Sequence, residues 1–381
     1  MIETAARLES VQEYYFSKKL AEVRDLEAQG KPIINMGIGS PDLAPPESVL
    51  ESLRQAIHDP HAHQYQSYKG LPVLRSAIAN FYTKWYNVTL DAGSQILPMM
   101  GSKEAIMHIS LAFLNQDDEV LIPNPGYPTY TSVTKLVQAK PRYYDLTEDQ
   151  NWFPNLEKLE KEDLSKVKLM WINYPHMPTG TAASIEQLTK IVAFAKRQNI
   201  LVVNDNPYSF ILNNNPTSIL EVSGAMECAI ELNSLSKSFN MAGWRVGMAV
   251  GQASYMQSIL KVKSNMDSGM FYGIQMGAVA ALQVEKDWFE SINSVYSKRR
   301  ALVHQLVDHL QCTYDKNTQG LFVWAKLPAS AGSASEFIDR LLHEHSIFVA
   351  PGTIFGSNGE GYIRFSLCVE ESLIKEAIAR L

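Results

Sequence analysis

The segment "CAIELNSLSK" (residues 228–237) is a short apolar run that ends in polar residues, and this pattern indicates the fold. Three earlier segments share it: "EVLIPNP" (119–125), "KLMWINYP" (168–175) and "ILVVNDNPY" (200–208). Runs of this length that alternate with helical patterns predict strand–helix–strand units. We therefore expect an α/β fold with a mostly parallel sheet and helices on both of its faces.

Polar residues stand where these predicted strands end. Asn173, Asp205 and Ser234 each follow an apolar run directly. In open α/β sheets, ligands bind outside the carboxyl ends of the strands. The sequence therefore predicts a ligand site at this edge of the sheet.

The two ends of the chain have a different pattern. Residues 11–32 read as a helix, and a long helix over 288–310 is expected to turn Arg299 and Arg300 toward solvent. Short strands and a helix over 334–345 follow, which is typical of a smaller α+β unit. The expected division is a large domain of residues 47–285 and a small domain formed by residues 1–46 together with 286–381.

Composition narrows the class of protein. The chain has 381 residues, of which 46% are hydrophobic, so a large core is expected. A net charge of −6 without a basic block argues against nucleic acid as a partner, and no apolar run is long enough to span a membrane. The three cysteines lie far apart without metal-site spacing, which favours a reducing cytoplasm. His58, His61 and His63 have no partner set of ligands, so we expect a solvated loop and no metal site.

The segment "SLSKSFNMAGWRVG" (234–247) carries groups suited to a covalently held ligand. It places Lys237 behind Ser234 and Ser236 and ahead of Arg245. Burial at a strand end lowers the pKa of a lysine, and a neutral amine forms a Schiff base with an aldehyde. The side chains of arginine and serine donate hydrogen bonds to phosphate oxygens. Taken alone, Lys237 is more simply explained as a solvated surface residue.

A second anion-binding element is expected at Gly101-Ser102-Lys103, at the start of an amphipathic helix. Backbone amides at a helix start attract anions, and glycine lets the anion approach closely. An ordinary helix N-cap explains this turn equally well.

Three more residues complete a ligand pattern. Asp205 follows an apolar strand and needs a cation such as a protonated ring nitrogen, although an N-cap or a salt bridge is an equal alternative. Tyr208 offers a donor to a ring oxygen, and Tyr127 offers a stacking face unless it is simply a core aromatic. An aldehyde, a phosphate, a ring nitrogen, a ring hydroxyl and a flat face together describe pyridoxal 5′-phosphate.

At this point the sequence resembles the class I/II aminotransferases of the pyridoxal-phosphate fold type I. The resemblance runs from "GIGSPDL" to "GYIRFSL" and includes "SLSKSFNMAGWRVG", "NDNPY" and "APGTIFG" in the expected order. It implies a homodimer in which the amino group of an α-amino acid passes to a 2-oxo acid by a ping-pong mechanism. The segment "KVKSNMDSGMFYGIQ" (261–275) is similar to the alanine and diaminopimelate branch, but aspartate and methionine enzymes share most of its pattern.

The resemblance implies roles for the cofactor residues. Lys237 would form the Schiff base and carry protons, Asp205 would pair with the ring nitrogen, and Tyr208 with the 3′-oxygen. Tyr127 would stack on the ring, and Tyr65 would reach the phosphate of the neighbouring subunit. The implied phosphate-binding residues are Gly101, Ser102, Lys103, Ser234, Ser236 and Arg245.

It also implies a substrate site, with one departure from the family pattern. Arg364 would bind the substrate α-carboxylate, helped by the backbone of Gly39. Met177, in "HMPTG", stands where the family usually has an asparagine that donates to the ring 3′-oxygen. Methionine cannot donate, so Tyr208 is expected to serve that oxygen alone and the pKa of the Schiff base to be raised. A carbon–sulfur β-lyase on the same fold would share these residues and is the alternative function.

Overall fold

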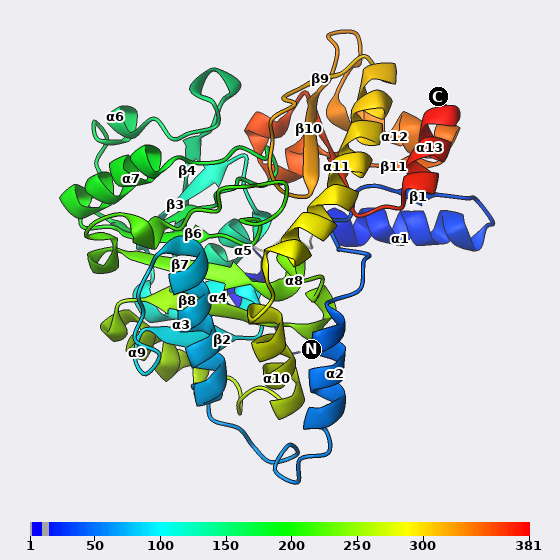
Figure 1. The fold of residues 1–381 in the computed structure, drawn as a ribbon. Helices are drawn as coiled ribbons and strands as arrows, with labels where there is room; N and C mark the ends of the chain where they lie inside the picture. The colour runs from blue at the N-terminus through cyan, green and yellow to red at the C-terminus, as the bar shows by residue number, and fades with distance from the viewer. Residues whose placement is uncertain (1, 10–14) are drawn as a thin grey trace.

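A seven-stranded sheet forms the centre of the protein. We describe a computed structural model that covers residues 2–9 and 15–381. The strands are β2 (Ile96–Met99), β3 (Glu119–Asn124), β4 (Lys140–Asp145), β5 (Val167–Ile172), β6 (Leu201–Asp205), β7 (Ala229–Ser234) and β8 (Gly247–Gly251). Their order is β2-β8-β7-β6-β5-β3-β4, with β8 antiparallel to both neighbours and the other pairs parallel (Figure 1). This confirms the mostly parallel α/β sheet that the sequence predicts.

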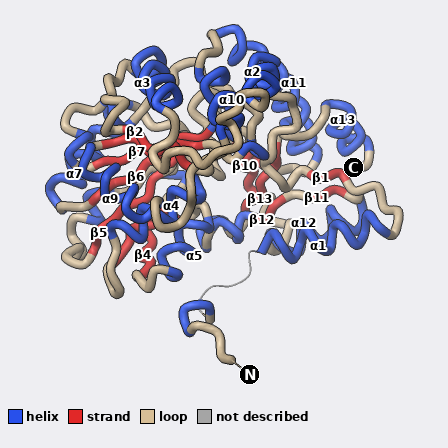
Figure 2. Tube along the Cα trace, turned by 90° about the horizontal axis from the view of Figure 1, so that it is seen from below, coloured by secondary structure: helices blue, strands red, loops and turns tan. Residues whose placement is uncertain are grey.

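Helices cover both faces of this sheet, as Figure 2 shows. One face packs against α4 (Ser102–Phe113), α5 (Pro128–Leu136) and α9 (Ala253–Lys263). The other packs against α2 (Glu47–Ala56), α3 (Pro72–Tyr86), α7 (Ile185–Gln198) and α10 (Tyr272–Leu282). Within β7, Ile230 and Leu232 join the first core, while Glu231 between them points to the other face. The period of two along a strand thus gives each face its own core.

A smaller unit contains the C-terminal part of the chain together with its N-terminal segment. The antiparallel sheet has the order β12-β13-β10-β9, and its strands are β9 (Thr313–Tyr314), β10 (Phe322–Lys326), β12 (Ala350–Pro351) and β13 (Tyr362–Ser366). Beside it, β1 (Ile34–Asn35) pairs in parallel with β11 (Ile347–Phe348). Figure 1 shows α1 (Tyr15–Ala28) on the side of the molecule that holds the C-terminal helices, and its Lys19 donates to Asp339 at 2.7 Å. The domain boundaries at residues 46 and 285 stay a prediction.

The predicted helices at the chain ends are present. A long helix, α11 (Lys286–His309), leads into the small unit, and α12 (Ala334–His345) matches the helix expected over 334–345. The expected start of the first helix near residue 11 lies outside the described residues. Within the described ranges, no helix is long and apolar enough to cross a membrane.

The expectation that Arg299 and Arg300 face solvent is wrong. Arg299 is 4% exposed and donates to both carboxylate oxygens of Asp42, at 2.7 and 2.8 Å. Arg300 is half-buried and donates to the carbonyl of Thr318 at 2.6 Å. A buried guanidinium is tolerated where its charge is paired, and the acid that pairs with Arg299 comes from the distant N-terminal segment.

Candidate active site

A cavity of about 430 Å³ opens at the carboxyl ends of β5, β6 and β7, between the two sheets. Every predicted site residue lines it except Gly101, which adjoins it, and Tyr65. Tyr65 is 91% exposed and lies outside the cavity. The chain therefore gathers residues from position 39 to position 364 at the strand ends, where an α/β sheet binds its ligand.

One end of the cavity is built to accept an anion. Gly101 has φ +86° at the start of α4, and a Cβ atom there would collide with Nη2 of Arg245. Only glycine suits this close approach. The Oγ of Ser102 is buried and makes no hydrogen bond within the described residues. The amides of the helix start, this hydroxyl and the Arg245 guanidinium fit a phosphate group.

The turn after β7 presents the serines at the same end. Ser234 caps α8 (Leu235–Ser238), where its Oγ accepts from the amide of Ser236 at 3.1 Å. The same Oγ donates to Oγ of Ser236 at 2.9 Å. Arg245 has a left-handed backbone, with φ +57°, and donates to the carbonyl of Ala242 at 3.0 Å. These local contacts hold the two hydroxyls and the guanidinium at one wall.

Asp205 ends β6 at the floor of the cavity, where it is 5% exposed. Its Oδ2 accepts from the hydroxyl of Tyr130 at 3.0 Å, whereas Oδ1 has no hydrogen-bond partner among the described residues. Burial raises the pKa of this carboxyl from 3.8 to about 6. A buried carboxyl with an unpaired oxygen fits a cationic ligand group such as a protonated ring nitrogen.

Two residues at this floor had no role assigned from the sequence. Tyr130 stacks on Trp171, with ring centroids 4.9 Å apart, and holds Asp205 from α5. Asn173 donates to the Asp205 carbonyl through Nδ2, and its Oδ1 accepts from the amide of Met177 at 2.8 Å. The position of Asn173 directly after an apolar run indicates a site residue. For Tyr130, the sequence offers no such indication beyond an aromatic side chain.

Lys237 projects from α8 into the middle of the cavity. Its Nζ donates to the carbonyl of Gly39 at 2.6 Å, and burial lowers the pKa of its ammonium. Tyr208 lines the same region, and burial raises the pKa of its phenol. Tyr127, which lines the wall, packs edge to face on Tyr130 at 5.5 Å. An amine, a protonated phenol and a ring face are thus available to one flat ligand.

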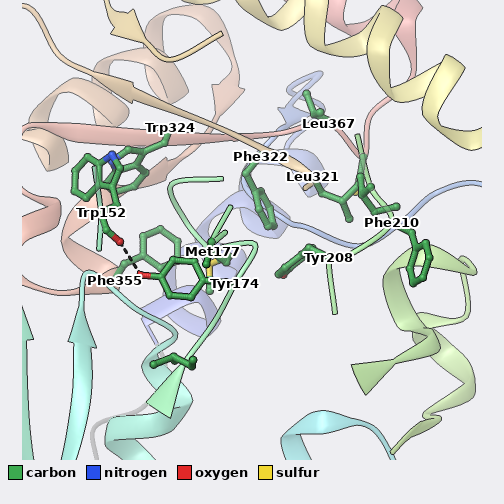
Figure 3. Close-up of a cluster of buried hydrophobic side chains, with 14 of the residues drawn as sticks. Trp152, Tyr174, Met177, Tyr208, Phe210, Leu321, Phe322, Trp324, Phe355 and Leu367 are labelled. Atoms are coloured by element: carbon green, nitrogen blue, oxygen red, sulfur yellow. Dashed lines mark hydrogen bonds between the residues drawn. The ribbon is translucent and has the colours of Figure 1, made fainter. Parts of the chain in front are cut away.

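The opposite end of the cavity surrounds one buried guanidinium with apolar groups. Arg364 lies in β13. Its Cζ atom is 3.9 Å from the ring centroid of Phe322 and 4.6 Å from that of Phe355. The guanidinium donates to the carbonyl of Gly37 at 2.8 Å and to Sδ of Met177 at 3.3 Å. Figure 3 shows the side chains of Met177, Phe322 and Phe355, the three that contact Arg364. The help of the Gly39 backbone with the substrate stays a prediction.

A group of possible metal ligands lies away from this cavity. Glu104, His108 and Asp267 bring their ligand atoms within 4.8 Å of one another. The ammonium of Lys263, which is 1% exposed, hydrogen-bonds to Asp267 there. The positive charge that these acids need is therefore supplied by the chain itself.

Comparisons with known proteins agree with this arrangement. Residues 31–381 match the family described as aminotransferase class I and II. An LL-diaminopimelate aminotransferase of Dehalococcoides mccartyi is 40% identical over 98% of this chain and 97% of its own length.

Solved structures are also similar. The substrate-bound BacF structure from Bacillus subtilis has a TM-score of 0.96 and 34% identity, and the match covers 100% of this chain and 97% of that one. A Thermus thermophilus aspartate aminotransferase double mutant shares the fold, with a TM-score of 0.93, 22% identity and coverage of 100% and 99%. The family match over nearly the whole chain, together with this cavity, shows that the chain belongs to the class I and II aminotransferases, a family that uses pyridoxal 5′-phosphate.

Proposed function

We propose that the cavity holds pyridoxal 5′-phosphate and that Lys237 bonds to it. The phosphate would lie against Ser234, Ser236, Arg245 and the Gly101–Lys103 turn. Asp205 would pair with the ring nitrogen, Tyr208 with the ring oxygen, and Tyr127 with the ring face. The observation that carries this assignment is the unpaired Oδ1 of the buried Asp205, in a cavity that also receives the amine of Lys237.

When bound, this cofactor supplies an electron-poor ring that stabilises negative charge at the substrate Cα. Lys237 would take the proton from that Cα, and burial favours this role because it lowers the pKa of the amine. Arg364 would hold the α-carboxylate and so fix the orientation of the Cα–H bond. The amino group would pass from an α-amino acid to a 2-oxo acid in two half-reactions of a ping-pong cycle.

We also propose a homodimer with shared sites. Tyr65 is 91% exposed in the single chain, and Phe271, whose ring stacks on that of His63, is 40% exposed. An aromatic side chain that extends into solvent suits a residue that reaches the phosphate of a partner. The three cysteines are free and buried, which supports the cytoplasm as the location.

The division of the cavity between the two proposed domains suits a closing site. At the Arg364 end, all lining residues except Met177 come from the proposed small domain of residues 1–46 and 286–381, and those at the phosphate end come from residues 47–285. Closure of the first over the second would exclude water from the substrate.

A lysine substitution tests the proposal. Purified protein with added cofactor should absorb in the visible range, and borohydride should fix the cofactor on Lys237. Lys237→Ala should lose this label and lower the rate of amino transfer at least about 1,000-fold, since it removes both the bonding amine and the base. Lys190→Ala, on the exposed face of α7, is the matched control. Pyruvate release from cystathionine without amino transfer would instead establish the β-lyase alternative.

A further inference from the structure

One short segment, residues 37–42, contacts two side chains of the proposed reaction. The carbonyl of Gly37 accepts from Nη2 of Arg364 at 2.8 Å, and the carbonyl of Gly39 accepts from Nζ of Lys237 at 2.6 Å. The two donors come from different parts of the fold, β13 and α8. The segment therefore lies between the proposed base and the proposed partner of the α-carboxylate. We call residues 37–42 the carbonyl segment.

The carbonyl segment depends on its neighbours for its shape. It lies between β1 and α2, is neither helix nor strand, and includes two glycines, the residues with the most backbone freedom to lose. Just before it, Met36 is bound on both sides: its carbonyl accepts from the amide of Ser366 and its amide donates to the carbonyl of Phe348, each at 2.7 Å. The upstream end is thus fixed to the small unit, and the carbonyls keep their positions only if the downstream end is fixed as well.

Arg299 fixes the downstream end. From α11, its Nη1 and Nη2 atoms donate to Oδ1 and Oδ2 of Asp42, at 2.7 and 2.8 Å. Nη1 also donates to the carbonyl of Leu367 at 3.1 Å, directly after β13. A bidentate pair sets both the position and the plane of a carboxylate. One guanidinium therefore joins the end of the carbonyl segment to the strand that carries Arg364.

We propose that Arg299, acting through Asp42, is a positioning residue that fixes the carbonyl segment and thereby the placement of the two side chains it contacts. This inference rests on the proposed function, because it takes Lys237 as the base and Arg364 as the partner of the α-carboxylate. A substrate bound by its carboxylate reacts only when its Cα–H bond points at the base, so the relative placement of these groups sets the rate. Arg299 and Asp42 are not among the residues that line the described cavity, so they act without touching the substrate.

Two substitutions release the downstream end. Arg299→Met keeps an unbranched apolar stem, and the Asp42 side chain left behind is 27% exposed and can reach water. Asp42→Asn keeps the shape of the acceptor and removes its charge. Each should lower kcat of the cofactor-loaded enzyme about 10- to 100-fold and change KM at most about threefold, because the binding groups remain and their relative placement is lost. The rates would be measured with the fastest amino donor among L-alanine, L-aspartate and LL-diaminopimelate.

Arg299→Lys separates positioning from stability. Lysine restores the charge but not the two-point contact with the carboxylate, so it should recover most of the melting temperature lost in Arg299→Met while kcat stays at least about tenfold low. A kcat that recovers in step with the melting temperature would overturn the proposal.

A matched ion pair outside the cavity provides the control. Arg142, in β4, pairs with Glu119 and Glu162 at 2.9 and 2.6 Å. Arg142→Met should keep the kcat and KM of wild type. An equal fall of kcat in this variant would show that loss of any ion pair slows the enzyme, and it would contradict a specific role of Arg299.

The cofactor-free protein gives a readout that does not depend on turnover. Acetic anhydride acylates neutral amines, and mass spectrometry compares the labelling of Lys237 with that of the exposed Lys190 in the same sample. The Gly39 carbonyl favours the charged form of the Lys237 amine, so its displacement in Arg299→Met should raise the relative labelling of Lys237 at least about threefold. Arg142→Met should leave this labelling unchanged.

The labelling also separates this inference from the proposed function. Labelling of Lys237 that is the same in wild type and Arg299→Met would overturn the positioning role, whatever the kinetics show. If no amino donor changes the cofactor spectrum of the wild-type enzyme, the proposed function fails, while the labelling still decides whether Arg299 fixes the carbonyl segment.

Discussion

Asp205 concentrates the electrostatic cost of the cavity floor in one side chain. Burial raises the pKa of its carboxyl from 3.8 to about 6, so the folded protein holds this proton more tightly than the unfolded chain does. The free energy of unfolding of the cofactor-free protein therefore falls as the pH rises between these values, and the loss is complete above the folded pKa. A shift of this size corresponds to roughly 3 kcal/mol.

Asp205→Asn should remove this cost and keep an acceptor for Tyr130. Without cofactor, the variant should be more stable than wild type by up to about 3 kcal/mol near pH 8, with the difference shrinking toward zero near pH 4. Thermal unfolding across this pH range measures it, and Glu186→Gln on the exposed side of α7 is the control. A difference that does not depend on pH would show that the charge of Asp205 is not the cause.

The sequence predicts site residues well where one residue carries its own signal. Lys237, Asp205 and Arg245 are charged residues beside apolar runs, and burial of a charge demands a partner. Tyr130 was missed because its role arises from a contact with Asp205 across 75 positions of the chain. Phe322 and Phe355 were missed for the same reason, since they look like ordinary core residues until the fold brings them to Arg364.

At the scale of elements, a buried carboxyl ties β7 to its neighbours. Glu231 is fully buried and accepts from Tyr82 on α3 at 3.0 Å, from Oγ of Ser218 at 2.9 Å and from the amide of Ile219 at 3.1 Å. The oxygen that accepts from Ile219, Oε2, also accepts from Asn204 on β6 at 3.1 Å, while Tyr82 and Ser218 donate to Oε1. These bonds fix the strands whose ends carry the cofactor residues.

Glu231→Ala should therefore destabilise the whole sheet. It leaves several buried donors without an acceptor, and each costs about 1–3 kcal/mol, so we expect a loss of at least about 3 kcal/mol. Chemical unfolding of the cofactor-free protein measures this loss. Glu227→Ala, at a largely exposed side chain just before β7, should cost at most about 1 kcal/mol. Similar losses in the two variants would refute the role of the buried bonds.

Elements are predictable where local pattern and tertiary contact agree. The four apolar runs became β3, β5, β6 and β7, because a buried parallel strand reads as a continuous apolar segment. The antiparallel pair β2 and β8 was not foreseen, since residues 96–99 pair with 247–250 and "GMAVG" has weak strand propensity. The burial of Arg299 likewise depends on Asp42, 257 positions away.

At the scale of the whole molecule, the proposed dimer predicts that two defective chains repair each other. Lys237→Ala disables its own site but still offers Tyr65 to a partner, and Tyr65→Ala retains its own lysine. In a mixed dimer, one site would contain Lys237 from one chain and Tyr65 from the other, and the second site would contain neither. Tyr65→Ala alone should weaken cofactor binding about 10- to 100-fold, the loss expected for one hydrogen bond to a charged group.

Mixing the two variants under conditions that exchange subunits should therefore restore tight cofactor binding and amino transfer to one site in each mixed dimer. Cofactor titration by absorbance and the rate of amino transfer at limiting cofactor measure this gain. Co-purification of an untagged chain with an affinity-tagged one reports how far subunits exchange. If that exchange occurs and the two variants together bind cofactor no better than Tyr65→Ala alone, Tyr65 does not act across the interface, because complementation requires the hydroxyl and the amine to come from different chains.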